Sequence, residues 1–131
     1  MTSRRRPEQQ IQRAVFEHLC WRGIAGTFAF HVPLGGARSG IEGAIFKGLG
    51  VVAGVPDVLV VSQGRLYALE LKIASGRLSP AQQHTHARLR AAGAEVAVAA
   101  GLDEALEQLE AWKLLRIPAS AGKAPGHPGN Y

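Results

Sequence analysis

The chain has 131 residues, of which 47% are hydrophobic, and it carries a formal net charge of +5 with an isoelectric point near 10.0. This length allows one domain with its own core and hardly two, and the apolar fraction excludes a wholly disordered chain. Cys20 is the single cysteine, so no internal disulfide can form, which fits a reducing compartment. We find no signal peptide and no apolar run of membrane-spanning length, so the expected location is cytoplasmic.

The charge balance indicates the kind of partner. A basic surplus on a small domain is typical of proteins that bind a polyanion, most often nucleic acid. The alternative is that the surplus only keeps the chain soluble, since part of it lies near the ends, at Arg4 to Arg6 and at Lys123.

The first half of the chain alternates helical and extended patterns. Apolar residues at Ile11, Val15 and Leu19 recur at helical spacing, and an aromatic-rich alternating stretch follows them. We expect a disordered basic arm over residues 1–6, a helix over 7–22, a strand over 27–32, a Gly- and Pro-rich loop over 33–40, and a short helix over 42–49.

The second half begins with a hairpin, and its next helix has clear start signals. Ser79 suits the N-cap, Pro80 the first helical position, and Gln82 the third position of a capping box. We expect a hairpin over 55–72, a helix from Pro80 to about 92, a strand over 95–99, a helix over 102–115 and a disordered tail over 118–131. The prediction is an α/β fold in one domain over 7–117, with a mixed four-stranded sheet flanked by helices in the order α-β-α-β-β-α-β-α.

The hairpin brings two acidic residues together. If its turn is centred on Gln63-Gly64, Ser62 faces Arg65 and Asp57 on the first strand faces Glu70 on the second. Directly opposed residues have Cβ atoms about 5 Å apart. Two carboxylates at that distance repel each other unless a positive group lies between them, and a divalent cation is the usual one.

The neighbours of this pair suit phosphodiester hydrolysis. Asp57 and Glu70 are the predicted metal ligands, and the backbone carbonyl of Leu71 is a third candidate oxygen. Lys72 shares a face with Glu70 and could orient the attacking water or stabilise developing charge. The alternative is a solvated strand with ordinary charges, but the remaining members of this face are apolar: Leu59, Val61, Leu66 and Ala68.

These residues resemble a known family. G-V-P-D at residues 54–57 followed by E-L-K at 70–72 resembles the PD-(D/E)XK nuclease superfamily, which has a restriction-endonuclease-like core. E-Q-Q-I-Q at 8–12, S-G-R-L-S-P-A-Q at 75–82 and G-A-E-V-A-V-A at 93–99 are similar to the VRR-NUC domain, in its standalone, phage-type form.

The resemblance implies a nuclease that depends on Mg²⁺ or Mn²⁺. It makes Asp57 and Glu70 metal ligands and Lys72 the catalytic lysine, and it brings Glu8 to the site from the first helix. Gln82 would be the family's helix glutamine near the site. Two alternatives stay open: Glu8 also suits the start of a helix, and a capping box explains Gln82 equally well.

Other positions are candidates for DNA contact or depart from the family. Leu34 stands where the family usually has asparagine, so a polar contact in that loop is lost. His84 and His86 are two apart on one helix, do not share a face, and are not predicted to be ligands. The predicted DNA-binding residues are His31, Arg38, Lys47 and Arg77.

Three functional hypotheses remain. The first is a DNA endonuclease that acts as a homodimer on branched DNA such as Holliday junctions, in a bacterial or phage-infected cell, without a membrane partner or small-molecule cofactor. The second is a restriction- or repair-type nuclease that cuts flaps, ends or duplex. The third is a module that binds nucleic acid without cutting it.

Overall fold

The computed structural model describes residues 5–33, 43, 45 and 47–118. Positions 43, 45, 47 and 48 are helical, inside the predicted helix over 42–49, and other parts of that helix lie outside the described residues. The main elements are α1 (Arg5–Arg22), β1 (Thr27–Phe30), β2 (Val58–Ser62), β3 (Arg65–Lys72), α3 (Pro80–Ala91), β4 (Glu95–Ala100) and α4 (Leu102–Ala111).

The four strands form one mixed sheet in the order β1-β2-β3-β4. The pairs β1–β2 and β2–β3 are antiparallel, whereas β3–β4 is parallel and is joined through α3. The restriction-endonuclease-like α/β class with a mixed four-stranded sheet, predicted from the sequence, is confirmed.

The hairpin between β2 and β3 has the predicted register. Ser62 pairs with Arg65 and Val58 with Leu69. Gln63 and Gly64 form the two-residue turn with φ of 51° and 77°. Two positive φ values in a two-residue loop are the conformation that follows the right-handed twist of the strands, and Gly64 adopts it without steric cost.

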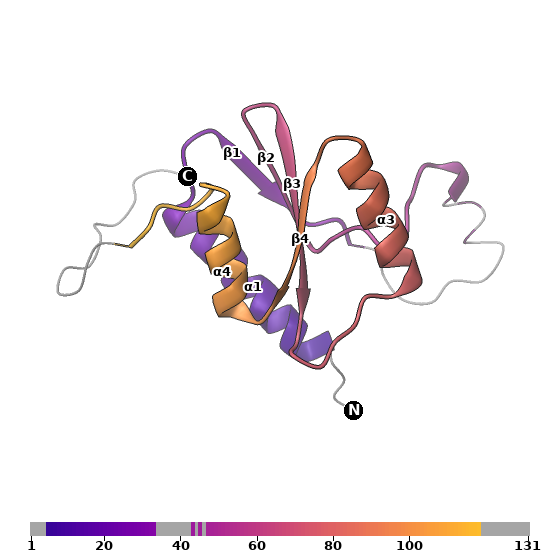
Figure 1. Ribbon diagram of the computed structural model, residues 1–131, viewed down its shortest axis with the longest axis horizontal. Coiled ribbons are helices and arrows are strands. Elements are labelled where there is room, and N and C mark those ends of the chain that lie inside the picture. Colours follow the sequence, from indigo (N-terminus) through magenta and orange to yellow (C-terminus); the bar gives the residue numbers. More distant parts are fainter. Residues whose placement is uncertain (1–4, 34–42, 44, 46, 119–131) are drawn as a thin grey trace.

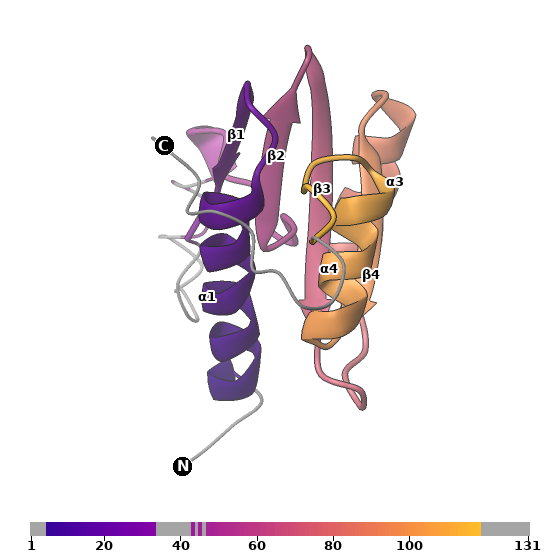
Figure 2. The same ribbon diagram turned by 90° about the vertical axis from the view of Figure 1, so that its left-hand side faces the viewer.

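One face of the sheet is covered by α1 and α4, which lie in contact with each other (Figures 1 and 2). Their buried residues are spaced four apart, as in a helix with one apolar stripe. Together with the inward-facing strand residues they form the main core: Val15, Leu19, Val58, Val60, Leu69, Leu71, Ala99, Ala105 and Leu109, with Leu114 and Leu115 after α4.

The opposite face of the sheet carries α3 (Figure 1). This helix buries Thr85 and His86, which are both polar. The segment before β2 packs against its first turns: Thr85 Oγ1 donates to the carbonyl of Ala53 at 2.5 Å. Gly54 lies so close that a Cβ there would be 2.3 Å from the carbonyl oxygen of Ala81, so only glycine fits.

Several predicted boundaries differ from those observed. The last helix ends at Ala111 and not near residue 115, because Lys113 has a φ of 62° and the amide of Leu114 bonds back to the carbonyl of Leu109, which closes the helix. Arg5 and Arg6 belong to α1 and not to a basic arm. Pro7 does not prevent this, because the N–H groups of the first helical turn have no partner inside the helix, so the N–H that proline lacks is not needed there. Residues 1–4 and 119–131 lie outside the described range. Within the part that is described, no helix has the length and apolar character to cross a membrane.

Candidate active site

Glu70 and Asp57 lie together at one end of the hairpin, although not in the paired arrangement that the sequence predicted. Glu70 is in β3 and only 2% exposed. Asp57 lies just before β2 and not on it, because the ladder ends at the pair Val58–Leu69. Its Oδ2 instead accepts a hydrogen bond from the backbone N–H of Leu71 at 2.8 Å.

Pro56 explains why the ladder stops there. In the register of the hairpin, the main chain of Leu71 faces the position of Pro56, which has no N–H. Pro56 therefore cannot donate to the carbonyl of Leu71, and the carboxylate of Asp57 takes the N–H of Leu71. The arrangement places a carboxylate beside a main-chain carbonyl that has no ladder donor from this strand.

The electrostatics of Glu70 reflect its burial beside a second carboxyl group. Burial, a side-chain hydrogen bond with Asp57 and the charge of Asp57 raise the pKa of Glu70 from 4.5 to about 9, and the charge of Lys72 only partly opposes this. Without another cation, Glu70 therefore keeps its proton at neutral pH. A divalent cation beside the pair would take the place of that proton.

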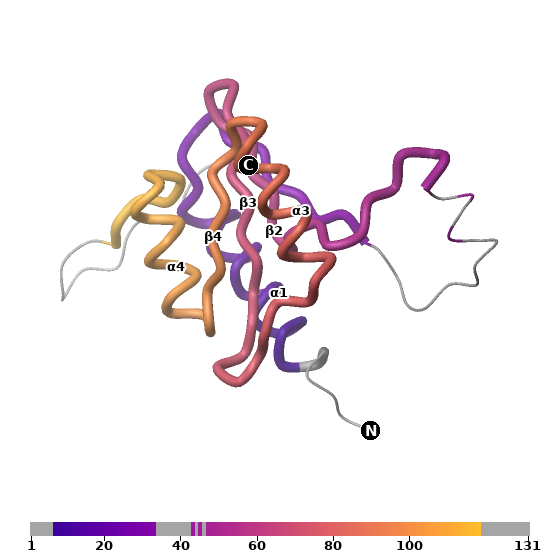
Figure 3. Tube along the Cα trace, turned by 45° about the vertical axis from the view of Figure 1, so that its right-hand side comes forward, coloured from indigo at the N-terminus to yellow at the C-terminus, as the bar shows by residue number. Residues whose placement is uncertain are grey.

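Glu8 acts on the same carboxyl from a different element. It lies in the first turn of α1 and is partly buried, and its charge adds to the raised pKa of Glu70. Figures 1 and 3 place the start of α1 at the same end of the molecule as the end of β3 and the loop over 73–79. The structure thus brings the predicted helix acid within electrostatic range of the pair.

Gln82 completes the capping box of α3 and also contacts Glu70. Its Oε1 accepts from the backbone N–H of Ser79 at 2.8 Å and its own N–H donates to Ser79 Oγ at 3.1 Å, so the capping box is complete. Its Nε2 donates to Glu70 Oε2 at 3.1 Å. One side-chain amide therefore joins the start of α3 to the buried carboxyl.

His86 is the residue that sequence reasoning missed. It is 1% exposed, and its Nε2 lies 3.1 Å from Glu70 Oε1. Burial lowers the pKa of His86, and the charge of Arg90 lowers it further. The available signal was its spacing from Gln82: residues four apart on a helix share a face, so both reach the same carboxyl.

Of the predicted DNA-binding residues, only His31 has a described contact with a residue of the site. His31 Nδ1 donates to the carbonyl of Asp57 at 2.7 Å, so this exposed side chain borders the site. Lys47 and Arg77 are exposed, and Arg77 lies in the loop that joins β3 to α3. Arg38 and the unusual Leu34 lie outside the described residues.

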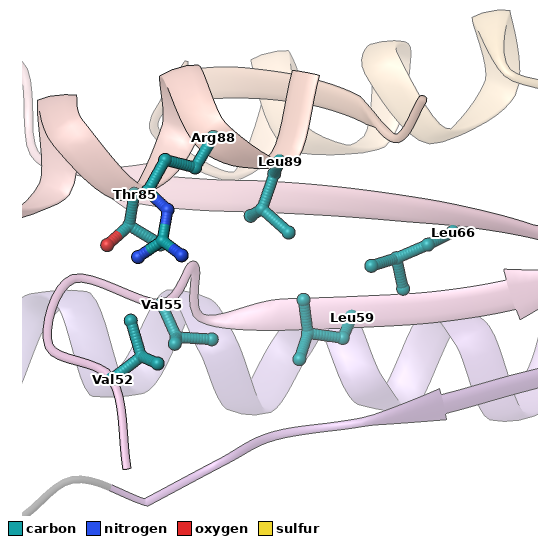
Figure 4. Close-up of a pocket in the computed structure, with 7 residues that line it drawn as sticks. All are labelled: Val52, Val55, Leu59, Leu66, Thr85, Arg88 and Leu89. Atoms are coloured by element: carbon teal, nitrogen blue, oxygen red, sulfur yellow. The ribbon is translucent and has the colours of Figure 1, made fainter. Parts of the chain in front are cut away.

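A pocket of about 300 Å³ lies between the β2–β3 hairpin and α3, on the face of the sheet that α3 covers (Figure 4). Its walls are mainly aliphatic, and Thr85 and Arg88 line it from the helix side. The other lining residues are Val52, Val55, Leu59, Leu66 and Leu89.

The donor set at this site suits a hard divalent cation. The described residues contain no group of three or more His, Cys, Asp or Glu side chains that could hold a metal ion. Two carboxylates, Asp57 and Glu70, with the carbonyl of Leu71 are nevertheless a set that Mg²⁺ accepts, because Mg²⁺ takes oxygen ligands and keeps several waters. The closeness of these two carboxyl groups, with Glu70 only 2% exposed, is the observation that favours a cation here.

Comparison with known proteins identifies similar structures. No protein-family model matches this sequence, and no curated protein matches it. A solved structure described as a VRR_NUC domain protein is 25% identical, with a TM-score of 0.68, over 82% of this chain and 89% of its own. A second solved structure, described as a VRR_NUC domain, is 22% identical, with a TM-score of 0.52 over 83% of this chain and 97% of its own. At this identity, the similarity shows that the two proteins share a fold.

Proposed function

Because this chain is a VRR-NUC domain, we propose that it is a metal-dependent DNA endonuclease that hydrolyses phosphodiester bonds. The observation that carries the proposal is the buried carboxyl of Glu70 beside Asp57, whose pKa is raised to about 9 by burial and by Asp57. Lys72 lies two residues further along the same strand, so it shares the face of Glu70. We assign the activity to residues 7–117.

Each residue of the site has a proposed role. Asp57, Glu70 and the carbonyl of Leu71 hold Mg²⁺ or Mn²⁺, and Glu8 supports them from α1. When bound, the cation supplies charge stabilisation for the phosphate and lowers the pKa of water. Lys72 orients the attacking water and stabilises the charge that develops on the phosphate.

The DNA backbone is held by exposed side chains, of which His31 borders the site. His31, Lys47 and Arg77 are exposed, and His31 is already in contact with the main chain of Asp57. We include Arg38 with them on sequence grounds. Contacts of this kind fix the position of the substrate and weaken as the salt concentration rises, because binding releases counterions from the phosphates.

We further propose that the enzyme acts as a homodimer on branched DNA. A two-fold dimer places two identical sites in a fixed relation, as is needed to cut two strands symmetrically. The resemblance to standalone phage-type enzymes supports a junction substrate and a bacterial or phage-infected cytoplasm as the place of action.

A cleavage assay tests the activity. Labelled four-way junctions, flaps, single strands and linear duplex are incubated with Mg²⁺, with Mn²⁺ or with EDTA. The expected result is paired symmetric nicks on the junction in either metal and none in EDTA. Asp57→Asn should abolish nicking, whereas Asp103→Asn, at an exposed acid of α4, should not.

The other outcomes separate the alternatives. Metal-dependent cutting of flaps, ends or duplex would replace the junction substrate with a restriction- or repair-type activity on the same site. Salt-sensitive binding that is indifferent to Mg²⁺, with no cutting of any substrate, would leave a nucleic-acid-binding module. Full nicking by Asp57→Asn would refute the site assignment, and a single monomeric mass by sedimentation would refute the dimer.

A further inference from the structure

We propose that His86 is a positioning residue, whose imidazole Nε2–H donates to Glu70 Oε1 while Gln82 holds Oε2, so that the carboxylate is fixed for a divalent cation. This inference rests on the proposed nuclease function. Neither the sequence nor the resemblance assigns a role to His86, and the mechanism above does not use it.

The contacts define a clamp with two donors on two different oxygens. His86 Nε2 and Gln82 Nε2 each lie 3.1 Å from a separate oxygen of Glu70. A carboxylate oxygen accepts two hydrogen bonds or ligands, so each oxygen keeps a lone pair for a metal ion. Free rotation of the Glu70 side chain would break both contacts, so the clamp fixes the plane of the carboxylate.

The position of the ring proton follows from the surroundings of His86. Among the described residues, His86 Nδ1 is buried and has no hydrogen-bond partner. A hydrogen on Nδ1 would be a buried donor with nothing to accept it, which costs about 1–3 kcal/mol. The proton of a neutral ring therefore belongs on Nε2, where the carboxylate accepts it.

The element that carries both donors is itself fixed to the site. The capping box at Ser79 defines where α3 begins, and Thr85, next to His86, holds the carbonyl of Ala53. Gly54 approaches the first turn of α3 too closely for any side chain. The loop that leads to Asp57 and the helix that orients Glu70 are therefore one rigid assembly, which is what an outer-shell partner needs in order to tune a ligand.

Three variants separate positioning from packing. His86→Leu fills the space without a donor. His86→Gln restores a donor at the same number of bonds from Cβ, because the Gln amide nitrogen matches Nε2 of histidine. His84→Leu makes the same change at an exposed site of the same helix and serves as the control.

The first measurement is the dissociation constant for Mn²⁺, by calorimetry or electron paramagnetic resonance, with nicking measured in parallel. His86→Leu should weaken Mn²⁺ binding roughly 10- to 100-fold, the usual effect of removing an outer-shell partner. His86→Gln should recover most of the affinity, and His84→Leu should match the wild type. Wild-type affinity and nicking in His86→Leu would overturn the proposal.

A second measurement works even where the variants fold poorly. In the Mg²⁺-loaded wild type, nitrogen chemical shifts of the imidazole should show the proton of His86 on Nε2, and a proton on Nδ1 would overturn the proposal. If the wild type binds Mn²⁺ but cuts no DNA, the nuclease function fails while the affinities still decide the role of His86.

Discussion

Helices α3 and α4 are attached to the sheet in different ways. The residues that α4 buries are Ala105 and Leu109, which pack into the main core with the strands and α1. The residues that α3 buries are Thr85 and His86, which reach polar atoms of the main chain and of Glu70. The buried side chains of α4 are therefore apolar, whereas those of α3 are polar and hydrogen-bonded.

The difference indicates that α4 mainly contributes to the stability of the fold, whereas α3 mainly fixes the position of the Glu70 side chain. Apolar burial is non-directional and contributes about 1.5–3 kcal/mol for each large side chain, so the buried side chains of α4 stabilise the fold. The polar contacts of α4, from Glu104 to the N–H of Ala100 and from Glu110 to Arg22, do not reach Glu70. Buried hydrogen bonds contribute less net energy but demand defined distances and angles. We therefore expect changes on the α4 side to alter stability and changes on the α3 side to alter the site.

The largest expected effect tests the active-site side of this comparison. Lys72→Met should lower nicking about 10²- to 10⁴-fold, the range for a group that assists proton transfer, because the water and the phosphate lose their positive neighbour. Urea unfolding should change little, since Lys72 is partly exposed at the end of β3. Arg65→Met, at the other end of the same strand, is the control. A rate for Lys72→Met equal to that of the control would remove the lysine from the mechanism.

The next effect tests the stability side. Leu109→Ala should lower the free energy of unfolding by about 2–5 kcal/mol, because it opens a cavity in the main core. Where the variant is still folded, its Mn²⁺ affinity should equal that of the wild type. Unfolding by urea and Mn²⁺ titration measure the two quantities, with Glu107→Ala on the exposed side of α4 as control. A loss of Mn²⁺ affinity in folded Leu109→Ala would break the division of roles.

The sequence predicted the fold because its local signals agree with one another. The Gln63-Gly64 turn determines the hairpin register, and the apolar spacing of Val15 and Leu19 identifies the buried side of α1. The predicted end of α4 was wrong because Lys113, just after the helix, has a positive φ. Lysine rarely adopts such a φ, so its residue type gave no sign of the helix end.

The site was predictable in its acids and less so in its supports. The hairpin register predicted that Asp57 and Glu70 lie together, and the structure places them side by side; their role as metal ligands stays a prediction. The exact place of Asp57 was wrong, since Pro56 was not recognised as the end of the ladder. His86 was missed because a histidine was considered only as a metal ligand, and its partner Glu70 comes from a different element.

A third prediction concerns pH and the charge of Glu70. Its pKa is raised in the folded state, so between about pH 4.5 and about pH 9 Glu70 is more protonated in the folded protein than in the unfolded chain. The contribution of Glu70 to stability therefore falls as pH rises through this range. Compared with Glu70→Gln, which cannot titrate, the metal-free wild type should lose stability steadily over the same interval.

Urea unfolding in EDTA across this pH range measures the difference between the two proteins. Saturating Mg²⁺ should abolish the decline in the wild type, because the cation replaces the proton. Parallel curves for the two proteins in EDTA would show that Glu70 is not buried as described.

The smallest expected effect separates the two roles of Gln82. Ser79→Ala removes the hydroxyl that accepts from the N–H of Gln82 and should cost about 1 kcal/mol, the usual value for an N-cap. The backbone N–H of residue 79 remains, so it still holds Gln82 Oε1 and leaves Nε2 on Glu70. Mn²⁺ affinity should therefore stay near that of the wild type in Ser79→Ala, whereas Gln82→Ala should lower both stability and affinity. Ser75→Ala, in the loop before α3, is the matched control. If Ser79→Ala weakened Mn²⁺ binding as much as Gln82→Ala, the cap itself and not the amide would orient Glu70.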